Sequence, residues 1–370
     1  MITYKRYFNK NIINEGGHKI EDYYGNKKII WTSSGRGSIE YLIDIIGFQD
    51  NEYVLLPAFV AEGLIRPFKR KKIKFLFYKS NSELIPDTDD IKELLNEFKV
   101  KLIVVIHYFG YPQNIKLIRD FTDNRNILIL EDCAQALFSC NGNGILLGTE
   151  GDFAVFSLPK FLPVPDGSFI IVNNSEYMHG KIKYRKSLLH FFSVISMIIY
   201  LYLKTFHVNK MQGGLSGVIN PILLLLQIVY YYSTNYANNP VKISGYTLKN
   251  LQKFNYEKFI SKRQNNILNI FKLQTLPFWK FLPVNINKIN LTGIPLIAKN
   301  RKEIIRKLKN NKIEVLTYTK RWNFFSENEK SRCENEMKFY DEHFLLPVSE
   351  NITEESFEKY FKTLTTIFSA

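Results

Sequence analysis

Short apolar runs alternate with longer amphipathic stretches through the first half of the chain. The apolar runs have the length of strands, and they lie at 53–56, 73–77, 102–106, 127–130, 153–156 and 169–172. Runs of this length are typical of strands that are buried on both faces of a sheet. The pattern therefore predicts a buried sheet.

The stretches between these runs have the spacing of helices. Apolar residues recur every three or four positions in 39–46, 91–98 and 115–121. The segment 86–90, Pro-Asp-Thr-Asp-Asp, supplies capping oxygens and first-turn negative charge to the second stretch. The alternation predicts an α/β fold, a mostly parallel sheet flanked by helices. Ligands of such sheets bind at the carboxyl ends of strands, so we expect the site after residues 106, 130 and 156.

The second half of the chain divides into an apolar middle and a charged, amphipathic end. From about residue 242 the pattern predicts helices at 256–271 and 301–308 and a strand at 295–298. A closing helix at 354–367 would place four large apolar residues on one face, namely Phe357, Tyr360, Phe361 and Leu364. We expect a large domain at 1–240 and a smaller C-terminal α+β domain at 241–370.

The apolar middle, about 187–233, contains two nearly continuous apolar runs, 188–203 and 222–232. Both runs are shorter than the about 20 apolar residues that a membrane-spanning helix requires. This favours buried or interface helices over membrane spans. Four basic residues within 181–186 precede the first run, which leaves a peripheral membrane contact as the alternative interpretation.

Composition limits the class of protein and its compartment. The chain has 370 residues, of which 45% are hydrophobic and 23% charged, as in an ordinary globular protein. Cys133, Cys140 and Cys333 form no CxxC pair, so neither a zinc site nor a disulfide framework is indicated. The first seven residues lack the apolar core of a signal peptide. We expect a cytoplasmic protein and no metal site.

The net charge favours an anionic partner. Fifty Lys and Arg residues against thirty-five Asp and Glu give +15, which would suit nucleic acid, anionic lipid or a phosphorylated small molecule. The basic residues are scattered without interleaved aromatic residues, and no nucleic-acid-binding motif accompanies them. A nucleic acid is therefore the least favoured of the three partners.

Two short segments carry groups that suit an anion and a cation. The segment 33–38, Ser-Ser-Gly-Arg-Gly-Ser, precedes the first predicted helix, where backbone N–H groups favour phosphate. A simple cap and turn is the commoner use of such a segment. After the run 127–130, Glu131 and Asp132 put two carboxylates at the edge of the sheet. One of them could face a cleft, or both could simply cap the next turn. The sequence favours neither interpretation over the other.

A third segment, 156–167, contains Lys160 among apolar and rigid residues. Desolvation disfavours an ammonium group, so it lowers the pKa of a lysine and makes the amine a nucleophile toward aldehydes. A lone lysine in a loop is more often simply solvated.

Taken together, the three segments resemble the DegT/DnrJ/EryC1/StrS family of sugar aminotransferases. That family uses pyridoxal 5′-phosphate (PLP) on the fold type I aminotransferase scaffold. Its order is a small-residue phosphate turn, an E-D-x-A-[HQ] motif, then F-S followed by a lysine. The corresponding residues here are Ser34-Gly35-Arg36, Glu131-Asp132-Cys133-Ala134-Gln135, and Phe156-Ser157 with Lys160. Further similarities lie at 56–59, 105–110 and 345–347, and the resemblance is good over about 28–175 and loose over the last hundred residues.

The resemblance implies a role for each matching residue. Lys160 would be the catalytic lysine that links to PLP and moves a proton between substrate and cofactor. Asp132 would pair with the pyridine nitrogen, and Gln135 would bond the phenolic oxygen. The phosphate would be held by Ser34, Gly35, Arg36 and Ser157. Phe59 would stack on the ring.

Three features depart from the family's pattern. Only two residues separate Ser157 from Lys160, about two fewer than in common members. The glycine-rich stretch after the lysine reads Pro-Asp-Gly-Ser at 165–168. The family's Asn-Tyr-Arg motif, which reaches the partner subunit, is not clear, and 245–249 is the nearest candidate.

The function implied by the resemblance is PLP-dependent transamination of a nucleotide-linked keto sugar to an amino sugar. L-Glutamate would be the amino donor, the product would serve a surface polysaccharide or related glycan, and the protein would be a homodimer. In relatives that dehydrate instead, His replaces the lysine, so Lys160 disfavours that branch. The alternative is a non-catalytic member that acts as a binding or scaffold protein at a membrane or in a synthase complex.

Overall fold

The structure is a computed structural model that describes residues 17–25, 27–210, 216–237, 240–271, 288–317, 325–352 and 354–369. The first seven residues, on which the signal-peptide prediction rests, lie outside this range.

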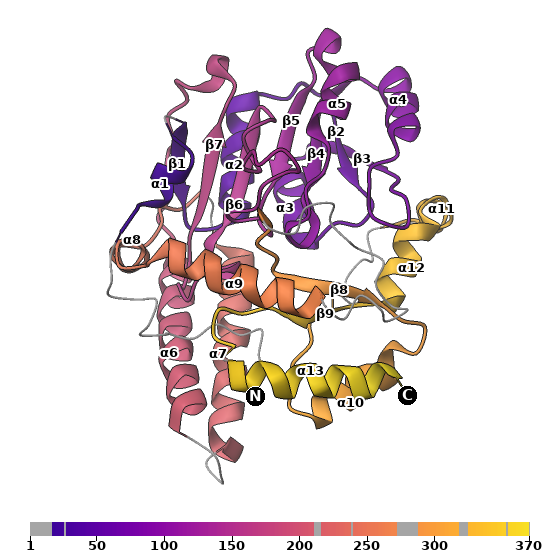
Figure 1. Cartoon of the computed structure of the whole chain (residues 1–370). Helices are drawn as coiled ribbons and strands as arrows, with labels where there is room; N and C mark the ends of the chain where they lie inside the picture. The colour runs from indigo at the N-terminus through magenta and orange to yellow at the C-terminus, as the bar shows by residue number, and fades with distance from the viewer. Residues whose placement is uncertain are drawn as a thin grey trace.

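The described residues form a central sheet of seven strands in the order β1-β7-β6-β5-β4-β2-β3 (Figure 1). Strands β2 to β6 run parallel, and β7 lies antiparallel between β6 and β1. Six of the strands confirm predicted runs, and β1 was not predicted. The strands are β1 Lys28–Thr32, β2 Tyr53–Pro57, β3 Lys74–Tyr78, β4 Val100–Ile106, β5 Leu128–Asp132, β6 Phe153–Ser157 and β7 Ser168–Val172.

Helices cover both faces of this sheet, as the alternation predicted. Alternate side chains of a strand point to opposite faces, so Val104 of β4 packs in one core cluster and Val105 in another. The first cluster includes α2 (Gly35–Ile46) and α3 (Glu62–Arg70). The second includes α4 (Thr88–Glu97) and α5 (Ile115–Thr122). The predicted cap of α4 is confirmed, since the carboxylate of Asp87 accepts the N–H groups of Asp89 and Asp90.

Short helices fill the connections around these elements. They are α1 Ile20–Tyr23 and the 3-10 turns η1 Tyr108–Gly110, η2 Asp123–Arg125, η3 Leu158–Lys160 and η4 Ser175–Tyr177.

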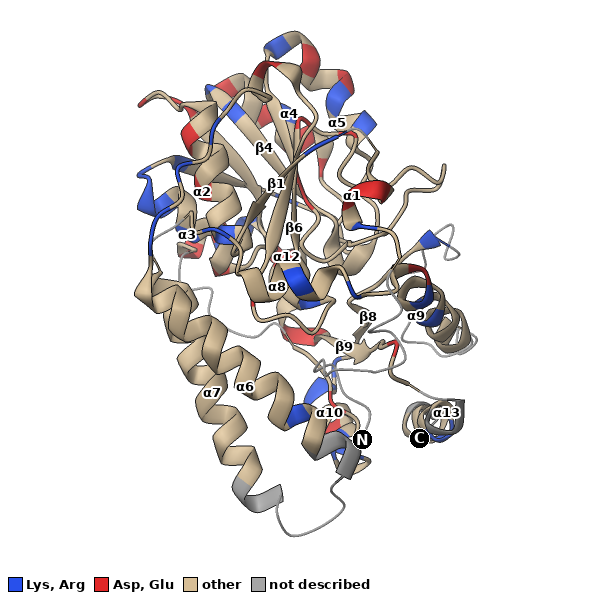
Figure 2. Ribbon diagram, turned by 90° about the vertical axis from the view of Figure 1, so that its left-hand side faces the viewer, with Lys and Arg blue, Asp and Glu red and all other residues tan. Residues whose placement is uncertain are grey.

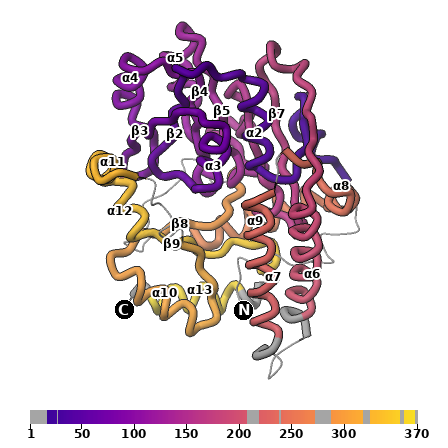
Figure 3. Tube along the Cα trace, turned by 180° about the vertical axis from the view of Figure 1, so that it is seen from behind, coloured from indigo at the N-terminus to yellow at the C-terminus, as the bar shows by residue number. Residues whose placement is uncertain are grey.

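The C-terminal segments pack below the carboxyl ends of the strands (Figures 1 and 3). A two-stranded antiparallel sheet, β8 with β9, is accompanied by α10 and α13. Tyr360 and Leu364 of α13 are buried, as the predicted apolar face requires. One core cluster contains residues from both the seven-stranded sheet and this region, for example Leu130 and Phe344. The boundary between 240 and 241 stays a prediction. The elements are α8 Gly245–Leu251, α9 Tyr256–Phe271, β8 Gly293–Ile297, α10 Arg301–Asn310, α11 Glu327–Arg332, α12 Glu334–Glu342, β9 His343–Pro347 and α13 Glu354–Ser369.

The apolar middle forms a helical hairpin of α6 (Leu188–Lys210) and α7 (Ser216–Tyr236), which projects below the sheet (Figure 1). Both helices were predicted, as buried or interface helices. Their outer sides are exposed within this chain, so burial in its own core is excluded for those sides, and an interface stays a prediction. The faces of the sheet are already covered by α2 to α5, so the hairpin packs mainly on itself. One stretch, Leu188–Phe206, with 19 residues and a mean hydropathy of 1.6, is long and apolar enough to cross a membrane, and 28% of it is buried.

Candidate functional site

A cavity of about 350 Å³ lies where the ends of β5 and β6 meet the beginning of α2. In the sheet Asp132 of β5 pairs with Val155 of β6, so the segments that follow these strands emerge side by side. Seven of the eight predicted site residues line the cavity, namely Ser34, Gly35, Arg36, Asp132, Gln135, Ser157 and Lys160. The hairpin supplies a further wall through His190, Ser193, Tyr230, Tyr231 and Thr234.

Lys160 reaches this cavity although its loop is short. Residues Leu158–Lys160 form the 3-10 turn η3 directly after β6. The N–H of Leu158 donates to the carbonyl of Gly167 at 3.0 Å, and the N–H of Gly167 donates to the carbonyl of Ser33 at 2.8 Å. Gly167 has φ +122°, which favours glycine, and an added Cβ would come within 2.9 Å of Leu158. The loop after β6, which departs from the family's pattern, is therefore held by backbone hydrogen bonds within itself and to the residue before α2.

Asp132 is the carboxylate that faces the cavity. Its Oδ1 accepts the N–H of Ala134 at 2.9 Å. Burial raises the pKa of Asp132, and the positive charge of Lys160 and the Ala134 N–H oppose that rise only in part. A partly desolvated carboxylate of this kind favours a cationic partner, and a protonated ring nitrogen would meet that demand.

Glu131, its neighbour, is instead a fully buried structural group. Oε2 accepts the Nε2–H of His107 at 2.8 Å and the N–H of Gly148 at 2.9 Å, and Oε1 accepts the N–H groups of Glu150 at 2.9 Å and Gly151 at 2.5 Å. Burial raises the pKa of Glu131, but these donors outweigh it, so the pKa lies below its ordinary value. Only one of the two carboxylates is thus available to a ligand.

Ligand atoms of His107, Glu131 and Cys133 lie within 4.8 Å of one another, as a metal site would require. However, Nδ1 of His107 accepts the N–H of Gln113 at 3.0 Å, and its Nε2 is bonded to Glu131. Because both nitrogens and both carboxylate oxygens already have partners, we interpret this group as a hydrogen-bond network.

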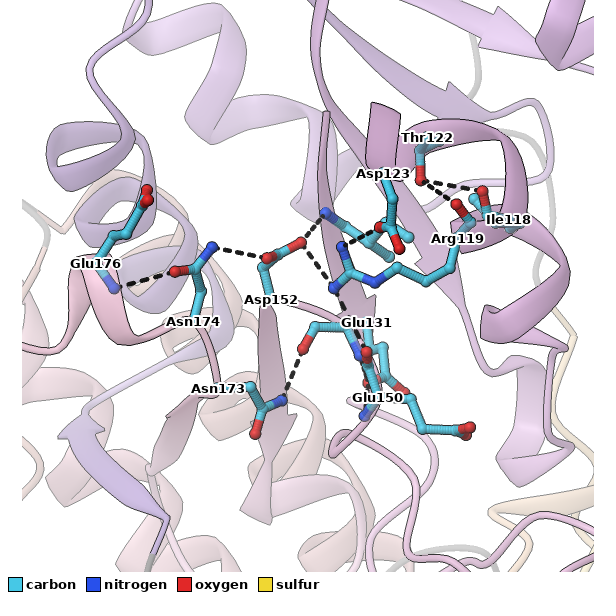
Figure 4. A network of polar contacts seen from close by, with 12 residues as sticks. Ile118, Arg119, Thr122, Asp123, Glu131, Glu150, Asp152, Asn173, Asn174 and Glu176 are labelled. Carbon is cyan, nitrogen blue, oxygen red and sulfur yellow. Dashed lines mark hydrogen bonds and ion pairs between the residues drawn. The ribbon is translucent and has the colours of Figure 1, made fainter. Parts of the chain in front are cut away.

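A second polar network fixes the end of the loop between β5 and β6, just before β6 begins (Figure 4). The carboxylate of Asp152 accepts the N–H of Ile129 at 2.8 Å and the side chain of Asn174 at 2.9 Å, and it pairs with Arg119 at 2.9 Å. Asn173 donates to the carbonyls of Gly148 and Gly151. Together these bonds hold the loop whose N–H groups hold Glu131.

Gln135 has a defined orientation. Its Oε1 accepts the N–H of Phe109 at 3.1 Å and lies 3.4 Å from the hydroxyl of Thr292. Since a backbone N–H needs an acceptor, this contact assigns the oxygen and leaves the NH₂ group as the donor to a ligand. The side chain therefore suits an anionic oxygen in the cavity.

The beginning of α2 offers backbone donors to an anion. The hydroxyl of Ser34 accepts the N–H of Gly37 at 3.2 Å and thereby caps the helix. Arg36 turns its guanidinium to α7, where it donates to the carbonyl of Thr234 at 3.2 Å and to the side chain of Asn235. Burial lowers the pKa of Arg36 from its ordinary value. This residue thus joins the helix start to the hairpin.

Phe59 is not among the described residues that line the cavity. Its ring packs against Phe339 at 4.8 Å and Tyr340 at 4.4 Å, between ring centroids. Ala61, Gly63 and Leu64, from the same part of the chain, reach the cavity instead. Stacking of Phe59 on a cofactor ring stays a prediction.

The sequence reasoning missed a pair of polar side chains in the cavity wall. Asp166 is buried and accepts the N–H and hydroxyl of Ser244 at 2.8 and 2.6 Å and the hydroxyl of Thr247. His190 Nε2 lies 3.3 Å from the same carboxylate. The signal was present, since Asp166 occupies the altered loop after Lys160, but His190 comes from the apolar middle and has no sequence motif.

The start of α8 is the segment 245–249, the nearest candidate for the family's intersubunit motif. In this chain Thr247 of this segment donates a hydrogen bond to Asp166, which lines the same cavity.

Comparisons with known proteins bear on these observations. Residues 11–187 match the model of the DegT/DnrJ/EryC1/StrS aminotransferase family. GDP-perosamine synthase of Escherichia coli O157:H7 is 25% identical over 145 residues, which cover 38% of this chain and 39% of that protein. GDP-4-keto-6-deoxy-D-mannose 3-dehydratase of Yersinia pseudotuberculosis is 24% identical over 167 residues, with 43% and 42% covered. The chain therefore spans about two fifths of the length of these curated relatives.

A solved structure extends the similarity to the whole fold. PseC of Helicobacter pylori, an aminotransferase involved in the biosynthesis of pseudoaminic acid, superimposes with a TM-score of 0.69. The match covers 100% of this chain and 99% of that one at 15% identity. The predicted fold type I aminotransferase architecture is confirmed. Over residues 11–187 and in its fold, the chain is similar to the DegT/DnrJ/EryC1/StrS aminotransferase family.

Proposed function

We propose that this protein is a PLP-dependent aminotransferase that converts the keto group of a nucleotide-linked sugar to an amine. The observation that carries the proposal is the meeting of Lys160, Asp132 and the beginning of α2 in one cavity. An amine nucleophile, a carboxylate for a cationic nitrogen and N–H donors for a phosphate are the three groups that PLP requires. These three groups lie far apart in the sequence. Their meeting in one cavity is therefore poorly explained by chance.

The residues fit the cofactor. Asp132 would hold the pyridine nitrogen, Gln135 would donate its NH₂ group to the phenolic oxygen, and the start of α2 with Ser157 would hold the phosphate. When bound, PLP supplies an electron sink for the carbon that gains or loses the amino group.

The chain's own groups have distinct tasks in such a reaction. The Nζ of Lys160 accepts and returns the proton at the reacting carbon, which is general acid–base catalysis. Asp132 keeps its carboxylate in a partly desolvated place, where the Coulomb interaction with a cation is stronger than in water. The contact of Asp166 with His190 joins the loop after Lys160 to α6 in the cavity wall.

The relatives support the substrate class. Besides GDP-perosamine synthase, the matching proteins include a dTDP-4-dehydro-2,3,6-trideoxy-D-glucose 4-aminotransferase, 22% identical over 156 residues. A nucleotide-linked keto sugar is therefore the proposed acceptor, L-glutamate the proposed donor, and a glycan the proposed destination of the product. A cytoplasmic homodimer is proposed with them.

Amino transfer tests this function directly. The PLP-loaded protein is incubated with L-glutamate and either GDP-4-keto-6-deoxy-D-mannose or a dTDP-linked 4-keto sugar. Mass spectrometry should detect an amino sugar nucleotide together with 2-oxoglutarate.

Lys160→Ala should lower the rate by at least about 10²-fold, whereas Lys92→Ala, on the exposed side of α4, should leave it unchanged. Absence of an amine product from every keto sugar nucleotide would contradict the proposed substrate class.

A further inference from the structure

The hairpin formed by α6 and α7 carries most of the exposed large apolar side chains of the described chain. Fifteen of the twenty such side chains lie on it. They are Leu188, Phe191, Phe192, Ile195, Ile199, Tyr202 and Phe206 on α6, and Ile222, Leu224, Leu225, Ile228, Val229, Tyr231, Tyr232 and Tyr236 on α7. At about half exposure each, they present on the order of 1,000 Å² of apolar surface, beyond the few hundred Å² usual for a soluble monomer.

Several polar groups of the hairpin are directed away from this surface. The hydroxyls of Ser196, Thr205 and Thr234 donate to carbonyls three or four residues earlier in their own helices. Lys204 is the one charged residue in 188–206 and 219–236, its side chain is 5% exposed, and it lies 4.0 Å from Glu314. Apart from the exposed Asn220 and the tyrosine hydroxyls, the outer face of the hairpin within 188–206 and 219–236 is therefore mainly apolar.

Basic residues flank the end of the hairpin nearest the sheet. Lys181, Lys183, Arg185 and Lys186 are exposed and directly precede α6. On the other side, Arg70 at the end of α3 donates to the carbonyl of Ala237 at 3.3 Å, which places the basic segment 66–72 beside the end of α7. Figure 2 shows the hairpin as mostly tan, with few charged residues, and Lys and Arg of α3 near its upper end. An apolar face bordered by cations matches the chemistry of an anionic lipid surface.

The exposed apolar residues form a broad face that spans both helices of the hairpin. On α6 the exposed residues 188, 192, 195, 199, 202 and 206 form one stripe. On α7 they occupy more than one side, since both 222, 225, 229, 232 and 236 and the adjacent positions 224, 228 and 231 are exposed. The exposed basic residues that border this broad face favour an anionic lipid surface over a second copy of the chain, which carries the same positive charge.

Charged elements next to the hairpin determine how it can lie relative to a bilayer. Glu314 lies against α6, and the charged helix α10 lies beside the hairpin (Figure 2). A hairpin that crossed the bilayer would carry these charges into the hydrocarbon, which is costly. A hairpin lying in the plane of the interface keeps them in water.

We propose that the α6–α7 hairpin docks side-on at the surface of an anionic lipid bilayer. His190 and Ser193 of α6 and Tyr230 of α7 also line the cavity. Docking therefore places the cavity at the membrane surface. This proposal does not depend on the reaction proposed above.

Vesicle flotation tests the docking without any measurement of activity. The full chain is mixed with vesicles of phosphatidylcholine alone or of phosphatidylcholine with phosphatidylglycerol, and its partition coefficient is measured at low and high salt. We expect binding to the anionic vesicles that weakens with salt.

The variant Ile195→Ser/Ile199→Ser/Leu225→Ser should lower the partition coefficient at least about tenfold, because three exposed apolar groups no longer enter the interface. The matched control Ile85→Ser/Leu117→Ser/Ile145→Ser changes exposed apolar residues elsewhere and should bind like the wild type. Circular dichroism should show the same helix content in all three proteins.

Equal binding of the hairpin variant and the control would overturn the proposal, as would failure of the wild type to float. A wild-type dimer that the hairpin variant converts to a monomer, without vesicle binding, would also overturn it and would assign the face to a second copy.

Discussion

Two adjacent carboxylates illustrate how the environment of a single residue decides its use. Glu131 and Asp132 are neighbours in the sequence, yet consecutive positions of a strand face opposite sides of the sheet. Glu131 meets four hydrogen-bond donors, which lower its pKa, and Asp132 meets the cavity, where burial raises its pKa. The first stabilises the fold, and the second is available to a ligand at a cost to stability.

Asp132→Asn should therefore not destabilise the protein without PLP. A carboxyl whose pKa is raised by folding binds more protons in the native state than in the unfolded state, so its contribution to stability falls as the pH rises through the window above about 3.9. At neutral pH the ionised group is a net cost, which Asn removes.

We expect the melting temperature of the PLP-free Asp132→Asn variant to equal or exceed that of the wild type. Its PLP affinity should fall at least about tenfold, because a charge-assisted hydrogen bond contributes about 1.5–3 kcal/mol. Glu131→Gln is the matched comparison and should destabilise by about 1–3 kcal/mol, since an NH₂ group would face N–H donors. A lower melting temperature for Asp132→Asn with unchanged PLP affinity would contradict this account.

Much of the site was predictable because its residues follow strands or begin a helix. Ser157, Lys160 and Asp132 come from segments that the strand pattern places at the same edge of the sheet. The role of Phe59 stays a prediction, because in this structure Gly63 and Leu64 at the start of α3 line the cavity and Phe59 does not. Asp166 and His190 were missed because their contact joins segments with no shared motif.

At the scale of elements, the apolar pattern of the sequence predicted the central strands of the sheet. It did not predict the edge strand β1 or the proline-containing helix α3. β1 was missed because its apolar core is only Ile29-Ile30-Trp31 between polar residues, which is short for a strand signal. α3 was missed because Pro67 lies inside it and interrupts the helical pattern. Its apolar side chains nonetheless bury against the sheet, which overrides the local preference.

Contacts between elements depend on close backbone approach at Gly110. This glycine ends η1 with φ +108°, and an added Cβ would lie 2.7 Å from the carbonyl oxygen of Asn290. The adjacent Phe109 carbonyl accepts the N–H of Thr292 at 2.8 Å, so this approach joins the main sheet to the segment leading into β8.

Gly110→Ala should lower the free energy of unfolding by about 1–3 kcal/mol, because the backbone contact must open and the left-handed conformation is strained. Gly142→Ala is the control, since nothing lies within 4 Å of its added Cβ. Denaturant unfolding measures both variants. Equal stability of the two variants would contradict the proposed role of the Gly110 contact.

At the scale of the whole molecule, the pattern of the sequence indicated helices in the apolar middle but not what covers them. An apolar helix has the same composition whether protein, lipid or a second subunit surrounds it. In this fold α2 to α5 already occupy both faces of the sheet, so the hairpin extends away from it. The same hairpin supplies part of the cavity wall. The exposed apolar face of the hairpin is therefore directly connected to the candidate site.

The central claim is that this cavity holds PLP through Lys160. The most direct measurement is peptide mass spectrometry of protein treated with PLP and reduced with borohydride, after the visible absorption spectrum has been recorded. We predict a yellow absorption band that reduction removes, with the PLP-derived mass on Lys160. The band should be absent in Lys160→Ala and unchanged in Lys92→Ala. Absence of the band in the wild type, or its persistence in Lys160→Ala with the label on other lysines, would contradict the account.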